Sequence, residues 1–94
     1  MDVMVNGAPV YAHTGGQPLK ADGPVMVLLH GAGMDHTVWV HQSRYLAHHG
    51  QSVLAVDLPG HGRSGGVPLE TIDALADWVI AFLDAVGVER AVLA

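Results

Sequence analysis

The stretch VLLHGAGMDHTVWVHQS, residues 27–43, places three histidines and two glycines directly after a run of apolar residues. It begins inside VMVLLH, residues 25–30, whose continuous apolar character is typical of a strand buried on both faces of a parallel sheet. Helical spacing follows over residues 37–49, with Trp39, Ser43 and Leu46 on the inner face. The stretch therefore predicts a strand, a glycine-containing turn and a helix.

A β-hairpin is predicted on the N-terminal side of this stretch. Its strands are expected at residues 3–5 and 10–13, because Asn6-Gly7 favours the tight turn that joins antiparallel strands.

Two further strands and one helix are predicted on the C-terminal side. SVLAVD, residues 52–57, and RAVLA, residues 90–94, are apolar runs typical of buried strands. Between them, apolar residues recur at helical spacing from position 69 to 86, including Ile72, with Thr71 as N-cap and Gly87 as C-terminal cap. The expected fold class is α/β: a β-hairpin followed by β-α-β-α-β with a parallel sheet.

The composition narrows the class of protein. Half of the 94 residues are hydrophobic, the formal net charge is −5, and the four Lys and Arg residues are scattered along the sequence, so a nucleic-acid partner is not expected. The absence of cysteine excludes disulfides and thiolate metal sites. The first residues lack the features of a signal peptide, and no apolar stretch is long enough to span a bilayer. We therefore expect a cytoplasmic protein without a membrane partner.

The glycine-rich loops do not match a nucleotide-binding motif. A dinucleotide fingerprint after residues 25–30 would need a third glycine where His36 stands. GHGRSG, residues 60–65, matches the fingerprint by letter, but Gly66 and Pro68 follow where a helix should begin. No phosphate-loop motif is present, so no nucleotide cofactor is expected.

The histidines of the opening stretch could instead hold a metal ion. His30 ends a strand, His36 is expected in a loop, and His41 lies on a helix, five residues beyond His36. Zinc-binding histidines on one helix are usually four residues apart. We therefore expect no metal site.

An acyl-transfer site fits the stretch best. A strand that ends in His-Gly and is followed by small residues can direct a backbone N–H into a pocket, where it stabilises the oxyanion of acyl transfer.

Three segments together resemble the α/β-hydrolase fold family, in its small esterase, lactonase and haloperoxidase-like branch. They are VLLHGAGMDHTVW, VLAVDLPGHGRSG and LADWVIAFLDAVGVERAVLA. The resemblance covers essentially the whole chain, from the hairpin to the last strand.

The resemblance implies roles for the first loop. The amide of Ala32 is expected to be the first oxyanion donor, and Gly33 and Met34 are expected to line the mouth of the pocket. His30 and Gly31 match the family's His-Gly turn, in which the histidine orders the loop by hydrogen bonds.

The second loop is expected to shape the site without carrying out the chemistry. Its histidine, His61, is expected to order the loop like His30. The residues that match the family's pattern here are Asp57, Gly60, His61, Gly62 and Ser64.

The chain departs from the family's pattern at its end. In the family, the strand resembling RAVLA leads into the nucleophile elbow G-x-S-x-G, and the acid and the histidine follow later. We therefore expect residues 1–94 to be an incomplete α/β-hydrolase domain, truncated just before the elbow, with no nucleophile, acid or base of its own. Such a fragment is expected to be inactive and able to associate through its exposed last strand.

The resemblance implies a serine hydrolase that cleaves a carboxylic ester, lactone or similar small acyl substrate, with no cofactor. One alternative within the fold is a haloalkane dehalogenase or epoxide hydrolase with an aspartate nucleophile. Those families tend to have Pro or Asn in the H-G-x-x stretch, and HGAG at residues 30–33 favours the serine branch. The other alternative is a non-catalytic binding module of the same fold.

Overall fold

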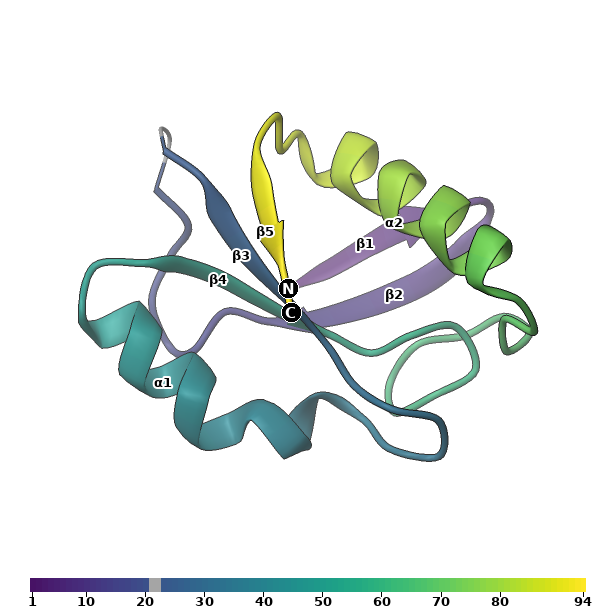
Figure 1. Ribbon diagram of the computed structural model, residues 1–94, viewed down its shortest axis with the longest axis horizontal. Coiled ribbons are helices and arrows are strands. Elements are labelled where there is room, and N and C mark those ends of the chain that lie inside the picture. The colour runs from purple at the N-terminus through teal and green to yellow at the C-terminus, as the bar shows by residue number, and fades with distance from the viewer. Residues whose placement is uncertain (21–22) are drawn as a thin grey trace.

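The computed structural model describes residues 1–20 and 23–94 and has the predicted α/β fold class (Figure 1). The predicted order of hairpin, strand, helix, strand, helix and strand is confirmed, with a short 3-10 helix, η1, added before the first α-helix. The elements are β1 (Asp2–Val5), β2 (Ala8–His13), β3 (Val25–Leu29), η1 (His36–Trp39), α1 (Val40–His48), β4 (Ser52–Val56), α2 (Ile72–Val86) and β5 (Ala91–Leu93).

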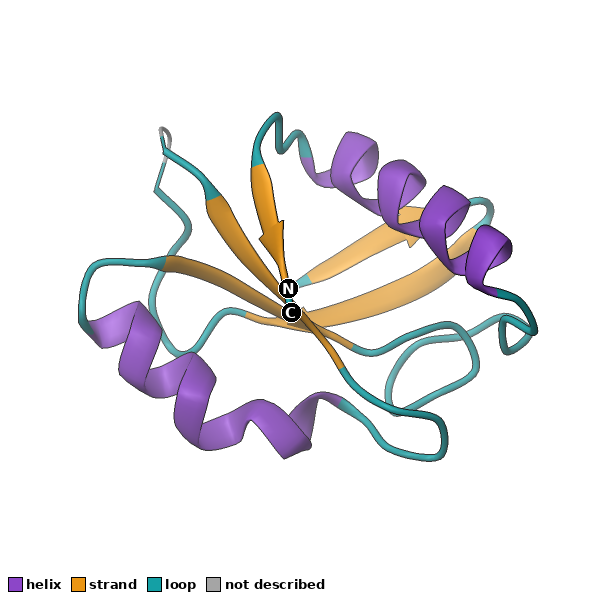
Figure 2. Ribbon diagram, in the orientation of Figure 1, coloured by secondary structure: helices purple, strands orange, loops and turns teal. Residues whose placement is uncertain are grey.

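All five strands form one mixed sheet in the order β1-β2-β4-β3-β5. β3 lies parallel to both β4 and β5, as predicted for the three buried strands. The hairpin joins the same sheet, because β2 pairs antiparallel with β4 through Ala12 and His13. The sheet is therefore not wholly parallel, and α1 and α2 cover its opposite faces (Figure 2).

The Asn6-Gly7 turn explains the hairpin. Asn6 has φ 51° and Gly7 has φ 82°, and two positive φ angles are what a type I′ turn requires. The turn sets the register, in which Val5 pairs with Ala8, so that β2 begins two residues earlier than predicted.

Two cores form, one on each face of the sheet. On the face covered by α2, Leu54 and Val56 of β4 pack in one cluster with Trp78 and Phe82, whose rings stack 5.4 Å apart. On the face covered by α1, Val53 and Ala55 pack in a second cluster. The alternation along β4 explains why this strand reads as a continuous apolar run.

The inner face of α2 differs from the prediction at one end. Trp78 is buried, although it was not among the apolar residues whose helical spacing predicted this helix. Ile72 was among them and is 79% exposed. Ile72 lies in the first turn of the helix, whose buried residues are Trp78, Val79 and Phe82. Both predicted caps are confirmed: Thr71 accepts the N–H of Ala74, and Gly87 has φ 76°.

The predicted helix over residues 37–49 is divided into η1 and α1. Asp35 caps η1 by accepting the N–H of Thr37, so His36 begins a helical turn instead of lying in a loop. Ser43 and Ala47 are the buried residues of α1. A Cβ atom at Gly15 would overlap with the backbone of Ser43 and with the Cβ of Ala47, so glycine permits this turn to pack directly against the helix.

Within the described residues, neither helix has the length and apolar character needed to cross a membrane.

Candidate active site

Two loops meet at the carboxyl ends of β3 and β4. The first loop, residues 30–35, follows β3, and the second loop, residues 57–66, follows β4. β3 and β4 are parallel neighbours, and their last residues, Leu29 and Val56, are partners in the ladder. The parallel pairing therefore places the two loops side by side.

His30 is buried and connects the first loop to the second. Its Nε2 accepts the backbone N–H of Leu58 at 3.0 Å. An amide is only a donor, so the ring carries its proton on Nδ1 and donates it to the carbonyl oxygen of Gly31 at 2.7 Å. His30 is thus a neutral ring with both nitrogens engaged.

His61 makes the same two kinds of hydrogen bond, but it connects the second loop to the first. Its Nε2 accepts the N–H of Gly33 at 3.1 Å, and its Nδ1 donates to the carbonyl oxygen of Pro59 at 3.0 Å. The rings of His30 and His61 lie with their centroids 5.1 Å apart. We call these two residues the histidine pair. Each ring accepts a hydrogen bond from a backbone amide of the other histidine's loop.

Ala32 lies between residues that these bonds hold. The carbonyl oxygen of Gly31 accepts the N–H of Met34 at 3.2 Å in addition to the proton of His30. The N–H of Gly33 is bound to His61. Within residues 1–20 and 23–94, the N–H of Ala32 donates no hydrogen bond, and Ala32 is exposed. The amide of Ala32 is therefore free on a loop that hydrogen bonds hold at the neighbouring residues.

Asp57 forms hydrogen bonds to the second loop and to His36, the residue that follows the first loop. Its carboxylate is fully buried, and Oδ1 accepts the backbone N–H of His36 at 2.7 Å and the Nδ1–H of the same residue at 2.9 Å. Oδ2 accepts the N–H of Arg63 at 2.9 Å. A Cβ atom at Gly62 would overlap with this carboxylate, so glycine permits the close approach.

Ser64 is also part of this support. Its hydroxyl donates to the carbonyl oxygen of Asp57 at 2.6 Å and accepts the N–H of Tyr11 at 2.9 Å. The side chain is buried and ties the second loop to β2. It is therefore engaged in structural hydrogen bonds.

The residues expected in the first loop divide between two hollows. His30 and Ala32 line a hollow of about 340 Å³ whose apolar wall comes from the second loop and from Leu69, Ile72 and Leu75. Gly33 and Met34 line an adjacent, more open hollow of about 460 Å³. His61 lines both, and Gly31 lines neither.

The contact between His36 and Asp57 was not anticipated from the sequence. The available signal was the position of Asp57 at the end of a fully buried strand, where an unpaired carboxylate is costly. Together with Asp35, these side chains bring three possible metal ligands within 4.8 Å of one another. Both oxygens of Asp57 already accept N–H groups, so a cation would have to displace those bonds.

The pKa of Asp35 is lowered, mainly because its carboxylate accepts the hydroxyl proton of Thr37, and further because it accepts the Thr37 N–H. The negative charge of the Asp35 carboxylate is therefore stabilised at the end of the first loop.

The chain belongs to the α/β-hydrolase fold family, since the family model described as alpha/beta hydrolase fold matches residues 24–94. This confirms the resemblance found in the loops.

Curated relatives differ in their chemistry. The chain is 36% identical over 94 residues to a dihydrolipoyllysine-residue acetyltransferase component of an acetoin cleaving system from Pseudomonas putida, covering 93% of this chain and 25% of the relative. It is 38% identical over 77 residues to epoxide hydrolase B from Mycobacterium tuberculosis, covering 79% and 22%. A pimeloyl-[acyl-carrier protein] methyl ester esterase from Klebsiella pneumoniae is 46% identical over 55 residues, covering 58% and 21%. The chain thus spans about a quarter of the length of these relatives.

Solved structures agree on the fold. An enol-lactonase from Burkholderia xenovorans LB400 superposes with a TM-score of 0.81 at 28% identity, covering 99% of this chain and 35% of that one. A haloalkane dehalogenase from Agrobacterium tumefaciens C58 gives 0.76 at 31% identity, covering 99% and 30%.

Proposed function

We propose that this chain is the front portion of a serine hydrolase that cleaves a carboxylic ester, a lactone or a similar small acyl substrate. The amide of Ala32 is proposed as an oxyanion donor. The observation that carries this proposal is the free N–H of Ala32, an exposed residue whose two neighbours are bound to the histidine pair.

The amide would act when a nucleophile attacks the carbonyl carbon of the substrate. The carbonyl oxygen then gains negative charge, and an N–H placed about 2.7–3.1 Å away stabilises that charge. A donor that is already fixed needs no reorganisation during the reaction, which is why a rigid loop suits this role. The serine, acid and histidine of the proposed triad would lie in a part of the protein that this chain does not include.

A second candidate is an aspartate-nucleophile hydrolase acting on an epoxide or a haloalkane. The 38% identity to epoxide hydrolase B and the match to the haloalkane dehalogenase structure favour it. A non-catalytic binding module is the third, because the fold alone does not define an activity.

The test uses the protein encoded by the complete reading frame, with two readouts. A fluorophosphonate probe should label an activated serine, and p-nitrophenyl acetate should be hydrolysed. Epoxide turnover without labelling would move the assignment to the aspartate branch, and neither activity nor labelling would favour a binding module.

Two substitutions at one position test the amide itself. Ala32→Pro removes the N–H and should lower kcat by about 10²–10³-fold, the usual loss for one oxyanion donor. Ala32→Gly retains the N–H and serves as the control. Equal kcat values for the two variants would remove Ala32 from the proposed mechanism.

A further inference from the structure

A hollow on the side of α1 that faces the end of β2 is lined by side chains that carry or can take up positive charge. Its volume is about 360 Å³. We call it the basic hollow, and it is lined by His13, Gly15, Gly16, Val40, Arg44 and His48. The last three of these are spaced four residues apart and therefore share one face of α1.

Positive charge is concentrated around this hollow in a chain whose formal net charge is −5. The pKa of His13 is lowered, first by partial burial and then by the nearby positive charges of His36, the N-terminal ammonium, Arg44 and Arg63. Two of the four Lys and Arg residues of the sequence thus act on one imidazole.

The two guanidinium groups are not neutralised within the part of the chain that the structure describes. Among those residues, neither Arg44 nor Arg63 forms a salt bridge. Arg63 lies over the ring of Tyr11, with 4.8 Å between Cζ and the ring centroid. The carboxylate of Asp57 is buried and already accepts three N–H groups. Asp2, the cross-strand neighbour of Tyr11, is exposed and forms no salt bridge either.

Hydrogen-bond donors are available on the walls of the hollow. The Nδ1 of His48 lies 3.3 Å from the side-chain amide nitrogen of Gln17. That nitrogen can only donate, so Nε2 of His48 carries the ring proton. Nε2 lies on the Gly16 side, 3.7 Å from where a Cβ atom of that residue would be. Within residues 1–20 and 23–94, the ring of His13 and the N–H groups of Gly15 and Gly16 have no hydrogen-bond partner.

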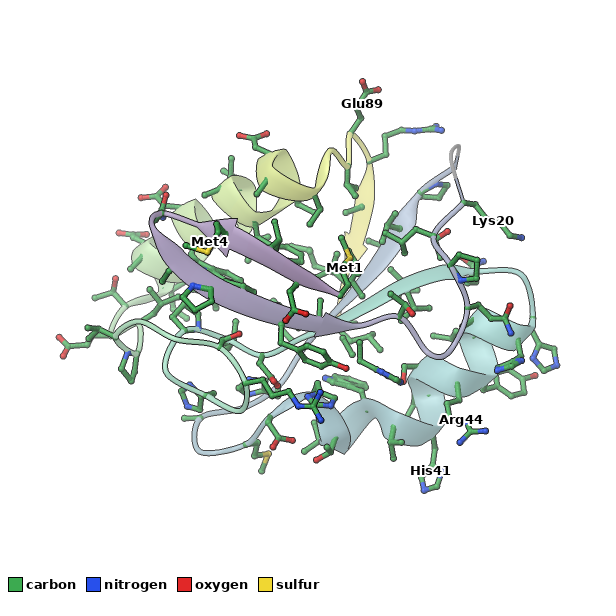
Figure 3. The ribbon with its side chains drawn as sticks, turned by 180° about the vertical axis from the view of Figure 1, so that it is seen from behind. Met1, Met4, Lys20, His41, Arg44 and Glu89 are labelled. Atoms are coloured by element: carbon green, nitrogen blue, oxygen red, sulfur yellow. The ribbon has the colours of Figure 1, made fainter. Side chains whose placement is uncertain are left out.

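We infer that the basic hollow binds a small oxyanion, a phosphate or carboxylate group, through Arg44, His13 and the Nε2–H of His48. Arg44 supplies a permanent charge, and the two imidazoles supply donors that strengthen when they are protonated. Figure 3 shows Arg44 projecting from α1, and its side chain lines the hollow. The site shares no residue with the loop that carries Ala32.

The test is an NMR titration of the protein with inorganic phosphate at constant ionic strength. Saturable shifts of the His13, Arg44 and His48 signals, together with a rise in the pKa of His13, are the expected result, since a nearby anion favours the imidazolium. Sodium chloride at the same ionic strength should not reproduce them. A parallel titration with acetate separates the two sources: saturation with acetate assigns a carboxylate site, and saturation with phosphate alone assigns a phosphate site.

Matched variants show whether the named side chains are responsible. Arg44→Gln should weaken phosphate binding roughly 2- to 5-fold, as expected for one exposed charge pair of about 0.5–1 kcal/mol. Arg90→Gln, another exposed arginine, lies outside this hollow and should leave the affinity unchanged. His48→Gln is a second variant, which removes the imidazole and should also weaken phosphate binding. Linear shifts, equal shifts with chloride, or an affinity unchanged by both Arg44→Gln and His48→Gln would overturn the inference.

Discussion

His30 and His61 face each other with their ring centroids 5.1 Å apart, and each accepts at Nε2 an amide from the loop of the other. Each ring also donates from Nδ1 to a carbonyl oxygen of its own loop. The two loops therefore stabilise each other, and neither can open without losing a hydrogen bond to the other.

Replacing one ring should loosen both loops. We expect His61→Ala to lower the free energy of unfolding by about 1–2 kcal/mol, because it removes two hydrogen bonds. Hydrogen exchange at the amide of Gly33 should become about tenfold faster or more. His41→Ala is the matched control, since His41 is exposed and forms no hydrogen bond among the described residues. Unchanged exchange at Gly33 would mean that His61 does not hold the first loop.

The approach of Gly62 to Asp57 should tolerate no side chain. Gly62 has φ 52° and Gly7 has φ 82°, so alanine is strained at either position. Only at Gly62 would the new Cβ overlap with a buried carboxylate, whereas nothing lies within 4 Å at Gly7. Chemical denaturation should show a loss of about 1 kcal/mol for Gly7→Ala and at least about 2–3 kcal/mol for Gly62→Ala. Equal losses would indicate that the loop adjusts without strain.

The lowered pKa of His13 predicts a pH dependence of stability. Its causes are partial burial first and then the surrounding positive charges. Above the usual value of 6.5 the ring is neutral in both states. As the pH falls below that value, the unfolded chain takes up the proton first, so stability decreases until the folded state is protonated as well.

Denaturation between pH 7.5 and pH 5 tests this dependence. The free energy of unfolding should fall less steeply with decreasing pH in His13→Gln than in the parent protein. His41→Gln should keep the parent slope. A parent slope retained in His13→Gln would exclude His13 as the source.

The outer edge of β5 should promote self-association of the 94-residue chain. β5 pairs only with β3 within residues 1–20 and 23–94, and Val92 and Leu93 are 51% and 54% exposed. Unpaired apolar edges pair readily with other chains. Analytical ultracentrifugation should therefore show oligomers at high concentration, and Val92→Lys should reduce them. A monodisperse monomer at every concentration would contradict the prediction.

The 94-residue chain should not hydrolyse esters by catalytic turnover. A stabilised oxyanion without a nucleophile and base gives only a small part of the acceleration of a complete triad. Assays with p-nitrophenyl acetate should show no saturable rate above buffer. A saturable rate that Ala32→Pro abolishes would place a nucleophile within these residues.

Local patterns in the sequence were sufficient for most of the secondary structure. Asn6-Gly7, Thr71 and Gly87 act through their immediate neighbours, so the hairpin and the ends of α2 could be predicted. The pairing of β2 with β4 could not, because the partners are more than 40 residues apart and no local signal specifies an antiparallel neighbour. The close approach of Gly15 to Ser43 and Ala47 of α1 could not be predicted either, because these residues are about 30 positions apart in the sequence.

The roles of the candidate site residues stay predictions, and their contacts could not be predicted. The His-Gly turn and the second loop carried enough pattern to single out His30, Ala32 and His61. The bond from Gly33 to His61 spans 28 residues and the contact between His36 and Asp57 spans 21, and spacing in the sequence does not encode such distances.

The strand order gives the backbone a reversal of winding at β3. The chain leaves β3 through α1 to reach β4 on one side, then returns through α2 to β5 on the other. The first connection leaves the carboxyl end of β3 and the second leaves the carboxyl end of the neighbouring β4. In open α/β sheets, ligands bind in the crevice at such a point. That crevice is a property of the chain path and not of any side chain. A family that keeps this path can therefore exchange its nucleophile while retaining the place where the reaction occurs.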